Sequence, residues 1–336
     1  MNNLLAQAST MRSLPLLLAL FLSCGLATVE ALSSAPAVQD ETVEVEGQRA
    51  VLITGASSGI GLKTTELLAS KGFFVYAGAR KEEDMKQLNA IDNVQAVRLD
   101  VTIQSDVDAA LAVVEAGGRG LYGLINNAGV VVLGPLVEIT EEDLDFQMDV
   151  NVTGPWRVTK AFAPMLIKSK GRIATTGSIS GFTTWGLGGP YSMSKHAIEA
   201  YTDVLAAEMA SFEVAVCVVE PGNYKSRIMT SMKERIEASG YSTEGSLFQG
   251  SMDRVLTNPS DRGQYKEPDE VAEAFLSFLN SETPKRRYMV VPNQREAEVT
   301  VRAAIARIVQ INEDHTYSYD RDELVKLLDE ALLAAE

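Results

Sequence analysis

The chain has 336 residues and a formal net charge of −15 at pH 7, with 46% hydrophobic and 22% charged residues. This composition is ordinary for a globular protein, and the length is sufficient for one large domain or two. The acidic balance and the lack of any basic run argue against a nucleic-acid partner, because phosphate contacts need clustered Lys and Arg. The two histidines and two cysteines lack the spacing of metal ligands, so we predict no metal site.

Residues 1–31 have the features of a secretory signal. Arg12 precedes a short apolar run over residues 14–26, and small residues follow that run. The run is shorter than the about 20 residues that span a bilayer comfortably. We therefore predict a signal peptide or membrane anchor over 1–31, and a location in the secretory pathway or endoplasmic reticulum. The same segment would allow association with a membrane, and import into an organelle is the alternative. Residues 32–48 are expected to be a linker.

From residue 50 onward, short apolar runs alternate with helix-length segments. Nearly continuous apolar runs are typical of strands buried on both faces of a parallel sheet. Such strands are expected at 51–53, 73–76, 94–97, 121–125, 172–176, 214–219 and 287–291. Helices are expected between them over 59–71, 82–90, 105–115, 142–169 and 191–212. This alternation predicts an α/β fold over residues 49–295, a single Rossmann-like doubly wound parallel sheet with helices on both faces.

Two segments depart from the alternation. Residues 223–265 are rich in Ser, Gly and Met, and they predict a small helical flap between the last two strands. Residues 296–336 predict a C-terminal helical extension, in which 320–335 carries apolar residues at helical spacing. That stripe could cover the core or form a subunit contact, and the sequence leaves both open.

A glycine-rich segment, Thr54-Gly55-Ala56-Ser57-Ser58-Gly59-Ile60-Gly61, follows the first expected strand and opens the first expected helix. Glycines there permit a tight turn, and a helix N-terminus offers N–H groups and a positive dipole to a pyrophosphate. A helix cap built from small residues would not require three glycines. We therefore predict a dinucleotide site at this loop, with contacts from Gly55, Ser57, Ser58, Gly59, Ile60 and Gly61.

Tyr191 and Lys195 are four residues apart and would share one face of a helix, while Ser178 ends an expected strand. Hydride transfer to a ketone leaves an alkoxide that must receive a proton. A tyrosine with the ordinary pKa of about 10 is a poor base for the reverse step near neutral pH, and a neighbouring ammonium lowers that pKa. The three side chains therefore predict proton handling, with Ser178 orienting the substrate oxygen. An exposed helix pair is the alternative for Tyr191 and Lys195.

Six separated motifs together resemble the short-chain dehydrogenase/reductase family, in the expected order and over roughly residues 49–295. They are the glycine loop, Asn126-Asn127-Ala128-Gly129, Asn151, Ser178, Tyr191-x-x-x-Lys195 and Pro221-Gly222. The resemblance implies that Tyr191 is the acid/base and that Lys195 also binds the nicotinamide ribose. It implies that Asn151 holds a proton-relay water near the lysine.

The same resemblance extends the expected cofactor site. It implies contacts from Asn127, Ala128, Gly129, Pro221, Gly222 and Ser226, the last standing where the family usually has a threonine. Members of the family often pair through the helices that correspond to 142–169 and 191–212. We therefore expect a homo-oligomer.

The end of the second expected strand bears on the choice of cofactor. An acidic residue there would bind the ribose 2′-hydroxyl of NAD. Ala79 occupies that position, and Arg80 and Lys81 follow. A guanidinium can pair with a 2′-phosphate, so NADP is favoured over NAD, although Lys81 could equally be a solvated helix start. Asp100 resembles the family residue that contacts adenine, with a turn or cap residue as the alternative.

These observations predict an NAD(P)-dependent oxidoreductase that interconverts a secondary alcohol and a ketone, or an alcohol and an aldehyde. Apolar residues over 130–132, 182–187 and the flap favour a lipophilic small molecule. Residues 197–201 and 220–223 resemble the branch that handles retinoids, steroids and hydroxybutyrate. A catalytically silent nucleotide-binding scaffold or regulatory protein is the alternative, and the complete Ser-Tyr-Lys-Asn set argues against it. A sugar-nucleotide epimerase or dehydratase would have the spacing Gly-x-x-Gly-x-x-Gly, which 55–61 lacks.

Overall fold

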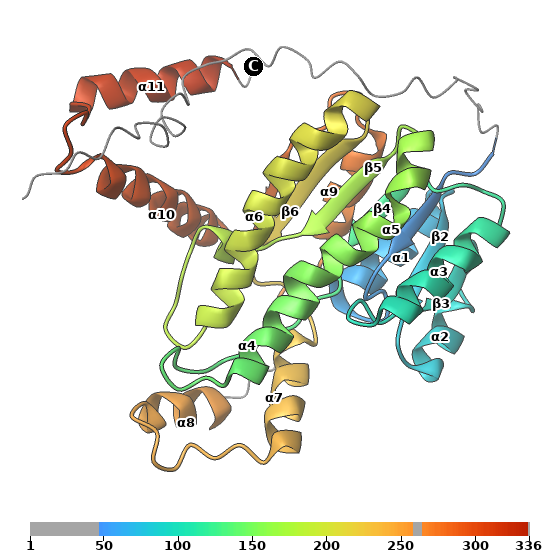
Figure 1. Cartoon of the computed structure of the whole chain (residues 1–336), viewed down its shortest axis with the longest axis horizontal. Coiled ribbons are helices and arrows are strands. Elements are labelled where there is room, and N and C mark those ends of the chain that lie inside the picture. The colour runs from blue at the N-terminus through green and yellow to red at the C-terminus, as the bar shows by residue number, and fades with distance from the viewer. Residues whose placement is uncertain (1–46, 258–263, 335–336) are drawn as a thin grey trace, which may run out of the picture. The chain divides into compact units, whose positions relative to one another are not determined.

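The computed structural model describes residues 47–257 and 264–334, so the predicted leader and the linker up to residue 46 lie outside the described residues. A seven-stranded parallel sheet with the order β3-β2-β1-β4-β5-β6-β7 forms the centre of the fold (Figure 1). The strands are β1 (Ala50–Ile53), β2 (Phe74–Ala79), β3 (Val94–Arg98), β4 (Gly123–Asn126), β5 (Arg172–Thr176), β6 (Ala215–Pro221) and β7 (Arg287–Val290). The α/β doubly wound class predicted from the sequence is confirmed.

The described residues also form helices, some of which cover the two faces of the sheet. They are α1 (Gly59–Ser70), α2 (Glu82–Leu88), α3 (Gln104–Ala116), α4 (Glu141–Met148), α5 (Gly154–Lys168), α6 (Gly189–Met209), α7 (Ile228–Ser239), α8 (Gln249–Thr257), α9 (Asp269–Asn280), α10 (Gln294–Asn312) and α11 (Arg321–Leu333). In Figure 1, α3, α5 and α6 lie in front of the sheet, and α1 and α9 lie behind it.

The alternation of side chains along each strand divides the core into two layers. On β1, Leu52 packs in one layer with Phe162 of α5, whereas Val51 and Ile53 pack in the other with Phe275 of α9. All five side chains are fully buried. Because both faces of the strand are covered by helices, its sequence is continuously apolar rather than alternating, which is the reason the strands were recognisable.

The structure differs from the expected elements at two places. The single helix expected over 142–169 is interrupted by a π-helical turn, Asp149–Thr153, after which α5 begins with Gly154 and Pro155. A Cβ on Gly154 would lie 2.7 Å from a methyl of Val101, so the close approach of α5 to this loop requires glycine. Helix α9 was not predicted, although its buried residues recur at helical spacing and it packs against α1.

The flap and the extension are both helical. Helices α7 and α8 lie between β6 and β7, as predicted for the flap. The expected domain end at residue 295 falls in the first turn of α10, where the Glu296 carboxylate accepts the N–H of Asn223 at 2.8 Å. Helix α11 has no buried residue, so its apolar stripe does not cover the core of this chain. Within the described ranges, every helix is too short or too polar to cross a membrane.

Candidate active site

One cavity of about 970 Å³ lies where the carboxyl ends of the parallel strands meet. Its wall includes Gly55 after β1, Arg80 after β2, Asn127 after β4, Ser178 after β5 and Gly222 after β6. Ligands of open α/β sheets bind in the crevice outside these strand ends, at the point where the strand order reverses. The fold therefore brings motifs that are far apart in the sequence to a single site.

Nearly every residue that the sequence predicted for the site lines this cavity. The exceptions are Gly61 and Asn151, which lie behind the wall. The residues that do line it are Gly55, Ser57, Ser58, Gly59, Ile60, Arg80, Asp100, Asn127, Ala128, Gly129, Ser178, Tyr191, Lys195, Pro221, Gly222 and Ser226.

The glycine loop has the backbone shape that a phosphate cradle needs. Gly55 and Gly59 have φ angles of +64° and +54°, which favour glycine. A Cβ on Gly61 would lie 2.2 Å from the carbonyl oxygen of Gly55, so the loop can fold back on α1 only with glycine there. Ser58 is the N-cap of α1, but its side chain makes no capping hydrogen bond. The first turn of α1 thus opens toward the cavity with N–H groups that suit a pyrophosphate.

The segment after β4 is fastened to the glycine loop by Thr54, a residue that the sequence analysis did not single out. The Thr54 hydroxyl oxygen accepts the backbone N–H groups of Asn127 and Ala128, each at 3.0 Å. The Asn127 amide nitrogen donates in turn to the carbonyl oxygens of Thr54 and Gly55, each at 3.1 Å. These bonds fix the segment after β4 against the glycine loop, and both segments line the cavity. A threonine directly before the first loop glycine is the only local signal of this function.

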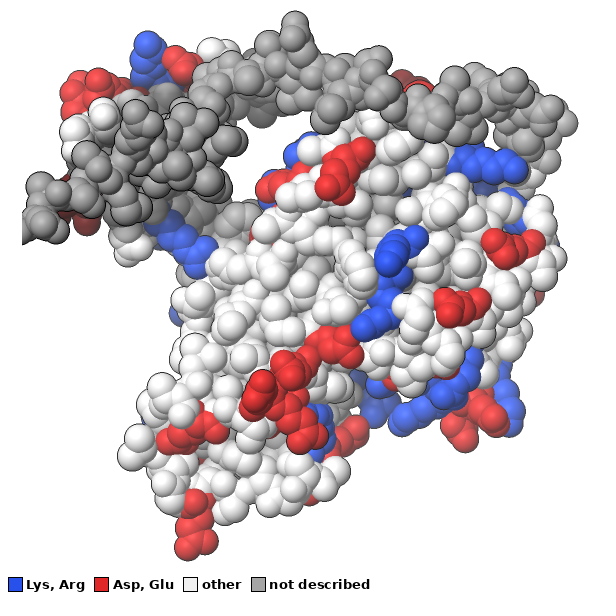
Figure 2. Space-filling model, in the orientation of Figure 1, with Lys and Arg blue, Asp and Glu red and all other residues white. Residues whose placement is uncertain are grey.

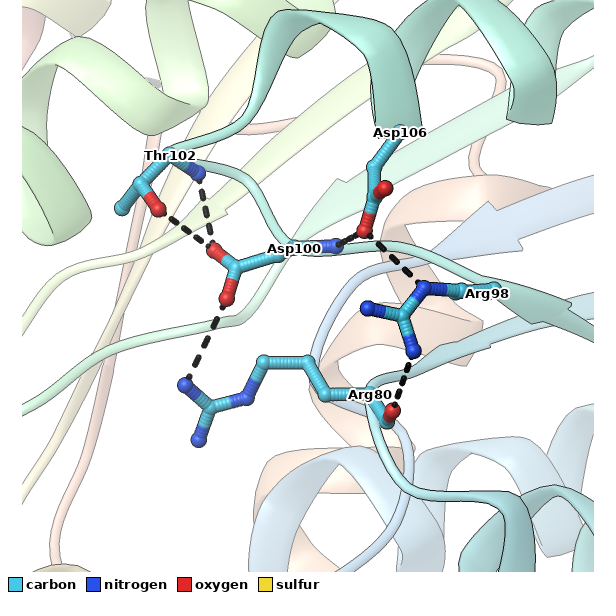
Figure 3. Close-up of polar contacts among 5 residues, drawn as sticks. All are labelled: Arg80, Arg98, Asp100, Thr102 and Asp106. Atoms are coloured by element: carbon cyan, nitrogen blue, oxygen red, sulfur yellow. Dashed lines mark hydrogen bonds and ion pairs between the residues drawn. The ribbon is translucent and has the colours of Figure 1, made fainter.

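An ion pair lies at the end of the cavity formed by β2 and β3 (Figure 3). A guanidinium nitrogen of Arg80 is 3.6 Å from a carboxylate oxygen of Asp100, and 64% of the Arg80 side chain is exposed. The other Asp100 oxygen accepts the backbone N–H and the hydroxyl of Thr102 at 3.0 and 2.7 Å. Burial raises the pKa of Asp100, but the Thr102 hydrogen bonds and the Arg80 charge outweigh it, so this pKa lies below its usual value. Asp100 is therefore both a turn residue and part of the wall.

Two further residues hold this ion pair in place. The Asp106 carboxylate accepts the backbone N–H of Asp100 at 3.1 Å and lies 3.6 Å from the Arg98 guanidinium. Arg98 also donates to the carbonyl oxygen of Arg80 at 3.1 Å, as Figure 3 shows. The backbone at Arg80 is thus fixed, whereas most of its side chain is exposed at the cavity.

Tyr191 and Lys195 lie on α6 at the other end of the cavity. The Lys195 ammonium nitrogen is 5.6 Å from the centre of the Tyr191 ring and donates to the carbonyl oxygen of Thr176 at 2.8 Å. Burial lowers the pKa of Lys195 to about 8, against the opposing charge of Glu199. Lys195 is accordingly still mostly protonated at neutral pH. The structure places a buried cation beside a phenol that faces the cavity.

Ser178 lies two residues after β5 and caps the short 3₁₀ turn Ile179–Gly181. Its hydroxyl oxygen accepts the backbone N–H of Ser180 at 3.1 Å, and the residue lines the cavity together with Tyr191. The hydroxyl proton is therefore the part of Ser178 that can be donated to an oxygen in the cavity. Ser178 therefore both caps the turn after β5 and lines the cavity.

Asn151 lies in the π-helical turn and uses its side chain within the protein. Its amide oxygen accepts the N–H of Val130 at 2.8 Å, and its amide nitrogen donates to the Val130 carbonyl oxygen at 3.0 Å and to the Ser194 hydroxyl at 3.1 Å. Gln147, which the sequence analysis missed, donates to the same carbonyl at 3.0 Å and accepts the N–H of Val132 at 2.7 Å. These two amides hold the 130–132 wall against α6. The relay function implied for Asn151 stays a prediction.

The wall beyond Tyr191 includes a group of apolar side chains. Val131, Phe146, Trp185, Met229 and Met232 line it, from the loop after β4, α4, the 182–187 loop and the flap. The flap is joined to α4 by an ion pair between Arg235 and Asp143, in which the Arg235 guanidinium also lies 4.4 Å from the centre of the Phe146 ring. This part of the cavity therefore offers a substrate hydrocarbon and aromatic surface next to charged groups of the flap, since Arg227, Glu234 and Arg235 line it too.

A doubly wound sheet, a glycine loop at a helix N-terminus and a Tyr–Lys pair in one cavity define a nucleotide-binding oxidoreductase. Residues 49–237 match the short chain dehydrogenase family. The chain belongs to this family and is an NAD(P)-dependent oxidoreductase, as the sequence motifs predicted.

Known proteins resemble this chain over different shares of its length. It is 33% identical to the uncharacterized oxidoreductase YbbO of Escherichia coli (strain K12), with 72% of this chain and 86% of that protein covered. It is 36% identical to the mitochondrial D-beta-hydroxybutyrate dehydrogenase of Bos taurus, over 54% of this chain and 56% of that protein. A short chain dehydrogenase/reductase from Burkholderia phymatum, solved in complex with NAD, superposes with a TM-score of 0.68 at 24% identity and covers 82% of this chain and 98% of its own. At this level of identity, the similarity is evidence for the fold alone.

Proposed function

We propose that this chain is an NADP-dependent dehydrogenase or reductase that interconverts a lipophilic secondary alcohol and its ketone, or an alcohol and its aldehyde. One observation carries the proposal. The buried ammonium of Lys195 lies beside the ring of Tyr191, in the cavity that the glycine loop also lines. A cation in this position favours the phenolate form of a neighbouring tyrosine.

The residues of the site divide the reaction between them. The nicotinamide, when bound, supplies or accepts the hydride. In reduction, Tyr191 gives its phenolic proton to the substrate oxygen, and in oxidation it takes the proton from the alcohol. Lys195 stabilises the phenolate that remains, and Ser178 donates its hydroxyl proton to hold the substrate oxygen near Tyr191. Asn151 would support proton return to Lys195 through water, as the family resemblance implies.

The proposed preference for NADP depends on Arg80. Its guanidinium is largely exposed and lines the cavity, and Ala79 stands where an acid would bind the NAD ribose. Asp100 pairs with Arg80 at 3.6 Å, which leaves the other guanidinium nitrogens able to bind a 2′-phosphate. The apolar wall at the opposite end of the cavity supports a lipophilic substrate.

We propose further that the chain forms a homo-oligomer and is directed to the secretory pathway or to a membrane by residues 1–31. Trp156 on α5 and Val204 on α6 are about half exposed, on the helices through which the family resemblance implies pairing. Figure 2 shows a largely uncharged surface over the middle of α6 on the face in view. Sedimentation of the purified protein would test the oligomer, and fractionation of cells with and without residues 1–31 would test the location.

A panel of alcohols and ketones, followed by nicotinamide absorbance with each cofactor, tests the proposed activity. Tyr191→Phe is the matched control, because it removes one oxygen and leaves the ring. We expect turnover in the wild type, its loss in Tyr191→Phe, and nearly unchanged cofactor binding in both proteins. Cofactor binding without turnover across the panel would favour the silent scaffold. Equal turnover in both proteins would contradict the proposed mechanism.

A further inference from the structure

Two buried carboxyl groups lie next to the catalytic residues but outside the cavity. Glu199 is one helical turn after Lys195 on α6, and Glu220 stands near the end of β6, directly before the cavity residues Pro221 and Gly222. Glu199 is 9% exposed and Glu220 is 3% exposed. Carboxylates are rarely buried to this extent unless they are paired, so their partners need to be identified.

The ion-pair partner of both carboxyl groups is the same residue, Arg287. The Arg287 guanidinium on β7 donates to Glu199 at 3.0 Å, lies 3.6 Å from Glu220, and donates to the half-exposed Asp203 at 2.8 Å. One oxygen of Glu199 and one of Glu220 have no hydrogen-bond partner among the described residues. Asp203 is half exposed and lies 3.7 Å from a second cation, Arg286, so the shortage of positive charge concerns the two buried carboxyls.

Burial acts on both of these groups. It raises the pKa of Glu199 although Arg287 opposes the shift, and together with the charge of Glu199 it raises the pKa of Glu220 to about 8. Two carboxylates that share one cation in a buried site cannot both ionise at low cost, and such pairs retain a proton.

Glu199 also contacts the backbone that carries Ser178. A Cβ on Gly181 would lie 2.7 Å from a Glu199 oxygen, and one on Gly177 would lie 3.4 Å from it. These glycines flank residues 178–180, so the Glu199 carboxyl packs directly against that turn. On its own helix, the negative charge of Glu199 opposes the loss of the Lys195 proton that burial causes.

We propose that Glu199 and Glu220 share one proton, and that Glu199, held by Arg287, is a positioning residue that sustains the charge of Lys195 and supports the turn of Ser178. The role in catalysis rests on the proposed function, whereas the shared proton does not. The charged and titratable groups that face this pair are Lys195 and Asp203 on α6, Cys217 on β6, and Arg286 and Arg287 at β7.

Titration of Lys195 in the full chain tests the link to the active site. In protein labelled with ¹³C-lysine, the Lys195 signal can be assigned from its absence in Lys195→Arg. We expect Glu199→Gln, which keeps the size and removes the charge, to lower the titration midpoint of Lys195 by on the order of one pH unit. Asp203→Asn is the control, because it removes another partner of Arg287, and we expect it to leave the midpoint unchanged. An unchanged midpoint in Glu199→Gln, or equal shifts in both variants, would overturn the proposal.

Infrared spectroscopy tests the shared proton without reference to turnover. The wild type should show the band of a protonated carboxyl at neutral pH. We expect this band to disappear in Glu199→Gln and in Glu220→Gln, because the remaining buried carboxylate then shares Arg287 only with the half-exposed Asp203, and to persist in Asp203→Asn. Absence of the band in the wild type, or its persistence in both Gln variants, would contradict the shared proton. If the protein turns over substrate, the alkaline limb of kcat/KM for reduction should move to lower pH in Glu199→Gln only.

Discussion

The charged groups at the two ends of the cavity differ in their exposure to solvent. At the β2–β3 end, Arg80 pairs with Asp100 at 3.6 Å and most of its side chain is exposed. At the α6 end, Lys195 is buried, and so are the carboxyls of Glu199 and Glu220 behind it. Exposed ion pairs contribute only about 0–1 kcal/mol, so Arg80 can exchange its partner for a ligand at little cost. A buried charge cannot lose its partner so easily.

This difference assigns different functions to the two ends. The exposed end suits discrimination between NADP and NAD, because the extra phosphate of NADP can bind Arg80 without disturbing the fold. The buried end suits chemistry, because fixed charges around Tyr191 and Lys195 need no rearrangement during proton transfer. Mutations at the two ends should therefore change different measured quantities.

The largest effect is expected at the buried end. Lys195→Met removes the ammonium but fills most of its volume, so Tyr191 loses the cation that favours its phenolate. We expect kcat/KM to fall by about 10²–10⁴-fold, the usual contribution of a positioned acid or base. Thermal stability should not fall greatly, because a buried charge is removed along with the hydrogen bond to Thr176. Lys326→Met on the exposed surface of α11 is the control. Retained activity in Lys195→Met would mean that this cation is not part of the machinery.

The glycine loop between the two ends should affect both cofactors alike. A methyl on Gly61 would overlap the Gly55 carbonyl oxygen and the Asn127 amide, so Gly61→Ala must displace the loop. Overpacking of this kind costs about 1–3 kcal/mol. We expect NADPH and NADH to bind more weakly by similar factors, as measured by nicotinamide fluorescence. Gly250→Ala on α8, where a Cβ meets no atom within 4 Å, should leave binding unchanged.

The exposed end should distinguish the cofactors. Arg80→Ala removes the guanidinium that would bind the 2′-phosphate, and a hydrogen bond to a charged group contributes about 1.5–3 kcal/mol. We expect the dissociation constant of NADPH to rise by about tenfold or more while that of NADH changes little. Lys81→Ala, one residue further along, shows whether the second cation contributes. Equal losses for the two cofactors in Arg80→Ala would overturn the preference for NADP.

The smallest effect concerns stability and pH. The raised pKa of Glu220, about 8 instead of 4.5, means that its contribution to stability is fully present below about pH 4.5 and is lost as the pH rises through 8. We expect Glu220→Gln to lose less stability than the wild type between pH 6 and pH 8, by at most about 1.4 kcal/mol per pH unit. Denaturant unfolding at several pH values measures this difference. The pKa of Asp203 is lowered, chiefly by its hydrogen bond to Arg287, so Asp203→Asn should follow the wild type in this range.

Much of the fold was predictable because its signals are local. Continuous apolar runs such as 51–53 and 214–219 correspond to strands with helices on both faces, and Thr54–Gly61 is a complete loop in eight consecutive residues. The Tyr191–Lys195 pair is similarly local, since helical spacing places the two side chains on one face. The break before Gly154 has a local signal too, the Gly154-Pro155 dipeptide, although our prediction from the sequence is a single helix over 142–169.

The residues that support the site were not predictable in the same way. Gln147 and Asn151 act on Val130 and Ser194 across two segments, and an isolated glutamine gives no sign of such bonds. Arg287 is 88 positions from Glu199, so nothing in the local pattern of either residue indicates their contact. Helix α9 carried a readable amphipathic pattern, but its position against α1 follows from the order of the strands.

The amino-acid sequence determined the class of fold, the dinucleotide loop and the reacting pair, because each depends on side-chain types at short, regular spacing. Tertiary structure decided the environment of these groups. It joined the ends of six strands into one cavity, left most of the Arg80 side chain exposed, and buried Lys195, Glu199 and Glu220 beside Arg287. Burial and the distances between distant segments set the electrostatic properties of ionisable groups, and these quantities exist only once the sheet and its helices have packed.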